Sequence, residues 1–338
     1  MASFGQFGND LYSGARSFPF VGRRRWWYLV SIVLVIVSIL GPLARGGFQI
    51  DKAFNFGIEF TGGSEFTVSN VSDTNQSIAS AAVTSVDPLV NPKVTIVGGD
   101  SVRVQTEQMT NQLTNEVAAA LAVGYGVPET QVTSSFIGAT WGADITTQAL
   151  RALIVFLILA GIVLALYFRT WKMSLVAIIA LIHDVIITAG IYGISGFEVT
   201  PGAVIGLLTI LGYSLYDTVV VFDKVRENTS GQTRDASLTY GQQVNLAVNQ
   251  TLVRSLNTTI VGALPVAAIL FIGAFILGAG TLRDISLALL VGIIVGTYST
   301  SFLAAPLYAG LRMREPAIKK NDERLLEMQE KAKERTVA

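Results

Sequence analysis

The sequence contains no cysteine, a single histidine and few charged residues. Without cysteine, the 338-residue chain cannot form a disulfide, bind a metal through thiolates or use a cysteine nucleophile. One histidine also cannot build a zinc site that needs several. Charged residues make up 14% of the chain, against about 25% in an average soluble protein. We therefore expect no bound metal and no cofactor, and a chain unlike an ordinary soluble domain.

Hydrophobic residues make up 51% of the chain, which predicts an integral membrane protein. Lysine plus arginine and aspartate plus glutamate number 24 each, so the overall charge gives no reason to expect a nucleic-acid partner. Six apolar segments are long enough to cross about 30 Å of hydrocarbon at about 1.5 Å of helix rise per residue. They are residues 26–43, 148–168, 173–193, 201–222, 252–277 and 282–311.

These segments divide the chain into regions. Basic residues gather before the first segment, between the second and third, after the fourth and after the sixth, all on one side of the membrane. Because basic residues near short loops mark the cytoplasmic side, both termini should be cytoplasmic. The predicted regions are a cytoplasmic N-terminus (1–25), a first transmembrane helix (26–43), an external domain (44–147), a five-helix transmembrane bundle (148–311) with a cytoplasmic loop (223–251), and a cytoplasmic tail (312–338).

The region 44–147 has the pattern of one small α/β domain. Alternating apolar and polar residues predict strands at 64–70, 93–97, 101–106 and 131–137, and the segments 75–86 and 110–121 suit helices. Gly98-Gly99-Asp100 between the second and third strands indicates a hairpin. The resulting order β-α-β-β-α-β is that of a ferredoxin-like domain. It contains no histidine, cysteine or nucleophile elbow, so binding or mechanical work is a better expectation than catalysis.

Asp217 lies deep in the apolar segment 201–222, and Arg254 lies at the start of 252–277. A charged residue at a helix centre costs about 2.5–3.5 kcal/mol on membrane-insertion scales, so a chain that keeps one has a use or a partner for it. Apolar surroundings favour a neutral carboxyl, whereas a nearby guanidinium favours a charged one. A movable Arg254 would then switch Asp217 between holding and releasing a proton. The alternative is a static ion pair that joins two helices.

His183 and Asp184 lie in the middle of the third apolar segment, where polar side chains also need partners. Adjacent residues on a helix point about 100° apart, so the two should not both face one partner. One hypothesis is a proton relay, because histidine titrates near neutrality. The other is a core in which Asp184 accepts hydrogen bonds from neighbouring helices and His183 packs among them.

Glycines mark two further features. In Gly57-Ile58-Glu59-Phe60-Thr61-Gly62-Gly63, the residues Gly57, Gly62 and Gly63 suit a tight turn or hinge where the domain leaves the membrane, and Glu59 adds an acid. Gly202 with Gly206, and Gly292 with Gly296, form small-residue faces that allow close helix contact.

Three motifs resemble the signatures of the SecF members of the SecD/SecF family over about residues 23–314. They are GIEFTGG at 57–63, GYSLYDTVVVFDKVREN at 212–228 and RSLNTT at 254–259. Tyr216 departs from the pattern, because many relatives carry asparagine there. The family also has an acid in the third span, which makes Asp184 a stronger candidate than His183.

The resemblance implies a function in bacterial protein export. SecF works with SecD, and together they resemble one transporter of the resistance-nodulation-division class, each supplying six spans and an external domain. The pair uses the proton-motive force to help preproteins finish crossing the cytoplasmic membrane after the motor ATPase has pushed them through the SecYEG channel. We expect one of the glycine faces to contact SecD. Whether the small subunit YajC also joins is left open.

Three alternative functions belong to other classes. An intramembrane aspartyl protease also uses two acids in adjacent spans, and Tyr216-Asp217 resembles half of its signature, but the second half, Gly-x-Gly-Asp within a span, is missing. We therefore expect no enzymatic activity. A self-sufficient proton-coupled exporter of small molecules would need two copies of this chain. A passive scaffold would tolerate neutral residues at Asp217 and Arg254.

Overall fold

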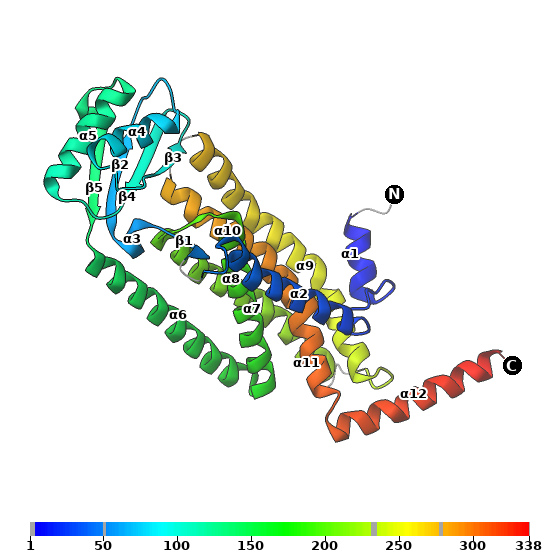
Figure 1. Cartoon of the computed structure of the whole chain (residues 1–338). Coiled ribbons are helices and arrows are strands. Elements are labelled where there is room, and N and C mark those ends of the chain that lie inside the picture. The colour runs from blue at the N-terminus through cyan, green and yellow to red at the C-terminus, as the bar shows by residue number, and fades with distance from the viewer. Residues whose placement is uncertain (1–3, 50–51, 231–234, 277–279, 338) are drawn as a thin grey trace.

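The computed structural model describes residues 4–49, 52–230, 235–276 and 280–337. Within these residues, six helices are long and apolar enough to cross a membrane, as the sequence predicted. Figure 1 shows them as a bundle with a small sheet domain at one end and both chain termini near the other. The helices of the bundle are α2 (Arg24–Arg45), α6 (Ala139–Phe168), α7 (Trp171–Ser195), α8 (Pro201–Thr229), α9 (Tyr240–Ala268) with the π-helical η3 (Ile269–Ile276), and α10 (Gly280–Tyr298) with the π-helical η4 (Ser299–Ala304) and α11 (Ala305–Arg312).

Helices α8 and α10 pack against each other through glycines. A Cβ atom built on Gly206 would lie 2.8 Å from the Cβ of Ala288, and one built on Gly292 would lie 2.3 Å from Ile210. A Cβ on Gly296 would lie 3.0 Å from Ser214. These glycines allow the two backbones to approach inside this chain. The expectation that one of these faces contacts SecD is therefore wrong for Gly206, Gly292 and Gly296, because the partner helix already covers them.

The sheet domain lies between α2 and α6 and contains the predicted succession β-α-β-β-α-β. Its four strands are antiparallel throughout, in the order β3-β4-β2-β5. The fully buried Phe66, Val68, Val102 and Val104 alternate along β2 and β4, so one face of the sheet packs beneath the helices. The elements are β2 (Gly63–Val68), α4 (Gln76–Val86), β3 (Lys93–Val97), β4 (Ser101–Thr106), α5 (Asn111–Tyr125), the short η2 (Glu129–Gln131) and β5 (Val132–Ile137).

Two helix boundaries differ from the sequence prediction around the expected cytoplasmic loop. Helix α8 continues to Thr229, and α9 already begins at Tyr240, so both helices extend into the region expected to form the loop. The capping box of Thr239 and Gln242 starts α9, and Val244 and Val248 continue its buried face toward the fifth apolar segment. The two helices are therefore joined by a shorter connection than residues 223–251.

Helix α6 also begins earlier than predicted, at Ala139, directly after β5. Its first turns extend the span to the sheet domain, where a Cβ built on Gly142 would lie 2.3 Å from the carbonyl oxygen of Phe60. The polar residues Asp144, Thr146 and Thr147 hid this extension, because the prediction followed hydropathy alone.

Several short elements escaped the sequence analysis. They are the helices α1 (Phe4–Ser13) and α3 (Ile58–Thr61) and the strands β1 (Asn55–Phe56) and β6 (Glu198–Val199). The charged tail forms a longer helix, α12 (Pro316–Val337). The N-terminal segment with α1 packs on α9, where Asn249 accepts a hydrogen bond from the backbone of Phe18 at 2.8 Å and donates one back at 3.0 Å. Helix α12 projects from the bundle at the same end (Figure 1).

Candidate functional site

Asp217 is buried on α8 and faces α9. The hydroxyl of Ser255 donates a hydrogen bond to its Oδ1 at 2.7 Å. Its other oxygen, Oδ2, is buried and has no hydrogen-bond partner among the described residues. A buried polar atom without a partner carries a free-energy cost, and such atoms are rare enough to need an explanation.

Arg254 does not form an ion pair with Asp217 in this structure. Its Nη2 donates to the hydroxyl of Tyr216 at 3.1 Å, and both of these side chains are exposed. Helix geometry explains the arrangement. Since adjacent residues point about 100° apart, turning Asp217 and Ser255 into the contact between α8 and α9 turns Tyr216 and Arg254 to the outer edge of the same contact. The structure thus brings the predicted pair onto neighbouring helices, with serine rather than arginine as the direct partner of the acid.

Asp184 and His183 lie in the core between α7 and its neighbours. The hydroxyl of Ser214, one turn before Asp217 on α8, donates to Oδ2 of Asp184 at 2.6 Å. His183 Nδ1 lies 3.3 Å from Oδ1 of Asp184, so the adjacent residues contact each other as well as separate partners. The His183 ring stacks on Tyr298 with centroids 6.2 Å apart, and its Nε2 is buried without a hydrogen-bond partner in the described chain.

Further hydroxyls extend this polar region across the bundle. Thr218 of α8 lies 3.0 Å from Thr300, oxygen to oxygen, and Thr300 is buried in the π-helical turn η4. Single π turns within α-helices occur often at functional positions. We call Asp184, Ser214, Asp217, Thr218 and Ser255 the polar core. On α8 its members stand at spacings of three and four residues, which place them on one face of that helix.

A second charged group lies where the bundle meets the sheet domain. Asp284, near the start of α10, is buried and accepts a hydrogen bond from Thr200 at 2.9 Å. Glu198 of β6 is buried and pairs with Lys93 of β3 at 3.3 Å. Neither acid was predicted from the sequence. Asp284 lies near the start of the last apolar segment, the same signal that identified Asp217, whereas the pair of Glu198 and Lys93 joins positions too far apart in sequence to be read from a pattern.

The glycine motif forms the connection between bundle and sheet domain. Gly57 starts α3 and its N–H donates to the carbonyl of Val199 at 2.9 Å. Gly62 and Gly63 have φ values of 75° and 148°, in the region that side chains rarely adopt. Burial raises the pKa of Glu59, and the carboxyls of Glu198 and Glu65 raise it further. The predicted turn at the domain boundary is therefore present, and its acid lies in a partly buried acidic environment.

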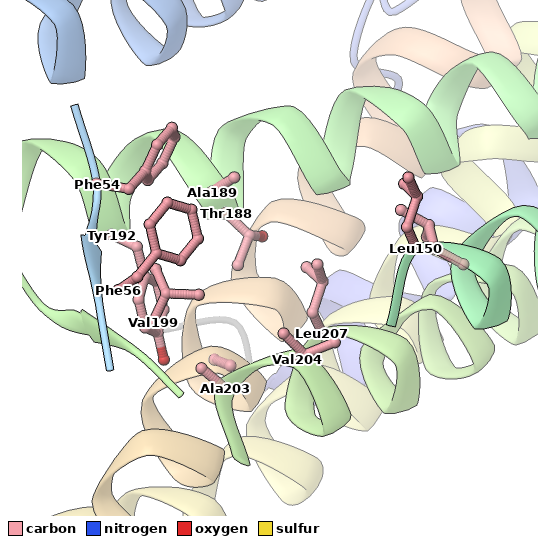
Figure 2. A pocket seen from close by; sticks show the side chains of 12 residues that line it. Phe54, Phe56, Leu150, Thr188, Ala189, Tyr192, Val199, Ala203, Val204 and Leu207 are labelled. Carbon is pink, nitrogen blue, oxygen red and sulfur yellow. The ribbon is translucent and has the colours of Figure 1, made fainter. Parts of the chain in front are cut away.

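An apolar cavity of about 440 Å³ lies beside this connection. Figure 2 shows Phe54 and Phe56 on one side, Thr188 and Tyr192 of α7 behind, and Leu150 of α6 opposite. Its other lining side chains are aliphatic, from α6, α7, α8, β6 and α10. The cavity offers apolar contact but no acid-base chemistry.

The polar core contains two carboxyls, Asp184 and Asp217, and each accepts a hydrogen bond from a serine hydroxyl. No cluster of three or more histidine or acidic side chains with metal-binding geometry occurs in the part of the chain that the structure describes. Carboxyls with hydroxyl partners and an unpaired oxygen can each gain or lose a proton with only small rearrangement of their partners.

Fold and site define a polytopic α-helical membrane protein with a small sheet domain and a buried carboxyl core. A family profile described as protein export membrane protein SecD/SecF, C-terminal, matches residues 118–314, and the SecD/SecF GG motif matches residues 50–69. The chain belongs to the SecD/SecF family of protein export membrane proteins.

Relatives and solved structures agree with this assignment. The protein translocase subunit SecF of Streptomyces coelicolor is 42% identical over 96% of this chain and 85% of its own length. The subunit of the same name from Mycobacterium tuberculosis H37Rv is 40% identical over 95% of this chain and 73% of its own length. The crystal structure of SecDF, a translocon-associated membrane protein from Thermus thermophilus, superposes with a TM-score of 0.72 at 28% identity. It covers 88% of this chain, which spans 39% of the SecDF chain.

Proposed function

We propose that this chain is an auxiliary, non-enzymatic subunit of the bacterial Sec translocase that works with a SecD-type partner. The pair couples the proton-motive force to the late stage of preprotein translocation through the SecYEG channel. The basic start of α2, at Arg24 and Arg25, and the basic end of α11, at Arg312, lie at the end of the bundle opposite the sheet domain. They support a location in the cytoplasmic membrane with both termini cytoplasmic. The sheet domain then meets the preprotein on the far side.

The unpaired Oδ2 of Asp217 is the observation that carries the proposal. A proton on this oxygen removes the cost of a buried charge, and its loss restores that cost. Arg254 lies on the neighbouring helix, and among the described residues its guanidinium is held only by the hydroxyl of Tyr216, so it can move to the ionised carboxyl. Each proton that descends the membrane delivers about 2.3 kcal/mol per 100 mV, enough to bias a conformational equilibrium of a few kcal/mol.

The exposed position of Arg254 supports a membrane-embedded partner. An arginine that faced lipid at this depth would cost about 2.5–3.5 kcal/mol on insertion scales. Tyr216 and Asn257 are exposed beside it and give the edge between α8 and α9 a polar character. We propose that the SecD-type partner covers this edge. The SecDF chain of Thermus thermophilus, of which this chain matches 39%, carries both halves in one polypeptide and supports that pairing.

Asp217→Asn tests the proposal. Inverted membrane vesicles should lose the proton-dependent part of preprotein export, while early ATP-driven translocation stays nearly unchanged. Asp223→Asn is the matched control, because Asp223 lies on the same helix but outside the polar core, where it accepts a hydrogen bond from Tyr167 at 2.7 Å. Equal export by parent and Asp217→Asn vesicles under a full proton gradient would contradict the proposal.

A further inference from the structure

Glu59 is a carboxyl that the polar core does not use. It lies on α3, outside the membrane-spanning helices, and its Oε2 is buried without a hydrogen-bond partner among the described residues. A Cβ atom built on Gly57 would lie 2.3 Å from this oxygen, so the carboxyl folds back over the glycine. Any larger residue at position 57 would push the carboxyl out of this position, which links the acid to the glycine motif.

The segment that carries Glu59 fastens the sheet domain to the bundle. On the bundle side, Asn55 and Phe56 of β1 pair in parallel with Glu198 and Val199 of β6. On the domain side, a Cβ built on Gly63 would lie 2.4 Å from the carbonyl of Thr106, so the segment also packs closely on the sheet. We call residues 55–63 together with β6 the joint.

The charged groups that face Glu59 come from three strands. Glu198 of β6 and Glu65 of β2 are acidic, and Arg103 of β4 is basic. The cations nearby are already engaged, because Lys93 lies 3.3 Å from Glu198 and Arg103 lies 3.7 Å from Glu65. Farther from Glu59, Arg283 likewise pairs with Asp284 at 3.3 Å. An ionised Glu59 therefore meets burial and repulsion from two carboxylates, which its own backbone N–H and the Arg103 guanidinium offset only in part, so that its pKa stays raised.

We propose that Glu59 is a proton-binding residue that controls the docking of the sheet domain on the membrane bundle. With Glu59 neutral, Glu198 is free to hold Lys93, and β3 of the domain stays against β6 of the bundle. With Glu59 ionised, the buried charge and the repulsion from Glu198 favour release of the domain into a state in which the carboxyl is hydrated. This inference rests on the proposed function and adds a second proton-responsive group to Asp217.

The direction of the pH dependence follows from the difference between the two states. Burial raises the pKa of Glu59 in the docked state, whereas the hydrated carboxyl of the released state has an ordinary pKa of about 4.3. The docked state is therefore favoured most at pH values below the ordinary pKa of the released state. It becomes less favoured as the pH rises through the raised pKa of the docked state. For a single group, the ratio of docked to released molecules falls at most about tenfold per pH unit within this window.

Two spin labels measure docking directly. The chain has no cysteine, so Ser85→Cys on α4 and Ser195→Cys at the end of α7, both exposed, give unique labelling sites. Pulsed electron paramagnetic resonance on the full chain in lipid nanodiscs, from about pH 4 to about pH 8, should show a longer distance that grows with pH. Glu59→Gln should keep the docked distance throughout. Glu129→Gln, an exposed acid on η2, is the matched control and should behave like the parent.

The outcomes separate the inference from its alternatives. A parent distance that does not change with pH, or a pH profile that survives in Glu59→Gln, overturns it. So does a Glu59→Gln chain that never shows the docked distance. Lys93→Gln provides a second variant and should increase the released population at every pH, because it removes the cation from Glu198. No gradient, preprotein or channel is present, so the result is independent of whether Asp217→Asn affects export.

Discussion

Gly292→Ala should destabilise the bundle by about 1–3 kcal/mol, the usual cost of overpacking a well-packed contact. The added Cβ would lie 2.3 Å from Cγ1 of Ile210, whereas ordinary contact begins at 3.4 Å. The difference of 1.1 Å (3.4 − 2.3) must be absorbed by separating α8 from α10 or by forcing Ile210 from its rotamer. An off-rotamer side chain alone costs about 0.5–1.5 kcal/mol.

The free energy of unfolding measures this cost. Purified protein in mixed micelles is titrated with sodium dodecyl sulfate, and unfolding is followed by tryptophan fluorescence. Gly212→Ala is the matched control, because no heavy atom lies within 4 Å of the Cβ built on Gly212 of α8. Alanine there should be neutral or stabilise the helix by up to about 1 kcal/mol, since glycine is the poorer helix former.

A double-mutant cycle tests the cause. Ile210→Ala removes Cγ1 and Cγ2, two of the three atoms that the new methyl group would meet. The double variant should therefore be more stable than the sum of the two single changes predicts, by about 0.5–3 kcal/mol. Equal losses for Gly292→Ala and Gly212→Ala, or additive effects in the cycle, would show that the contact between α8 and α10 is not the tight glycine packing described above.

Two further predictions concern the charged groups. Arg254→Met should also abolish proton-dependent export in inverted vesicles, because the ionised acid then has no cation to meet; export equal to the parent would contradict this. At Glu315, burial favours a higher pKa, but hydrogen bonds from Lys172 and Arg312 outweigh it and lower the pKa. Its ion pairs should therefore be lost as the pH falls below about 4.3. Protease cleavage of α12 should then accelerate in the parent, whereas Glu315→Gln should be cleaved rapidly already at neutral pH.

Hydropathy was sufficient to predict the six spans, because residues that face lipid and residues that face the core are both apolar. Alternation was sufficient to predict the strands of the sheet domain. The strands at 93–97 and 101–106 have the predicted bounds, and Asn75 and Thr110 prove to be helix caps. The short β1 and β6 could not be predicted, since two-residue strands leave no periodic signal. Helix α1 was missed for a related reason, because it packs on α9, far away in sequence, where Gln250 donates a hydrogen bond to the carbonyl of Tyr12.

For the candidate residues too, the sequence predicted the residues that stand out in their own segment but not their partners on other helices. An acid in an apolar segment is visible from the sequence alone, which is how Asp217 and Asp184 were found. Their partners, Ser255 and Ser214, were not, because serine is common in membrane helices and its role depends on which helix it faces. Arg254 was predicted as the direct partner of Asp217 because the two charges are opposite. The prediction neglected the rotation of about 100° between adjacent helical residues, which turns Ser255 toward the acid and Arg254 away from it.

The identity of these partners bears on what the polar core can do. A serine hydroxyl donates a hydrogen bond to a carboxylate and accepts one from a carboxylic acid, so Ser255 can remain bonded to Asp217 in either protonation state. A buried arginine in its place would favour the charged carboxyl strongly and resist protonation. With serine inside and Arg254 at the edge of the helix contact, the cation is available without being fixed. This separation of a permanent neutral partner from a movable charged one is what a reversible proton site in lipid requires.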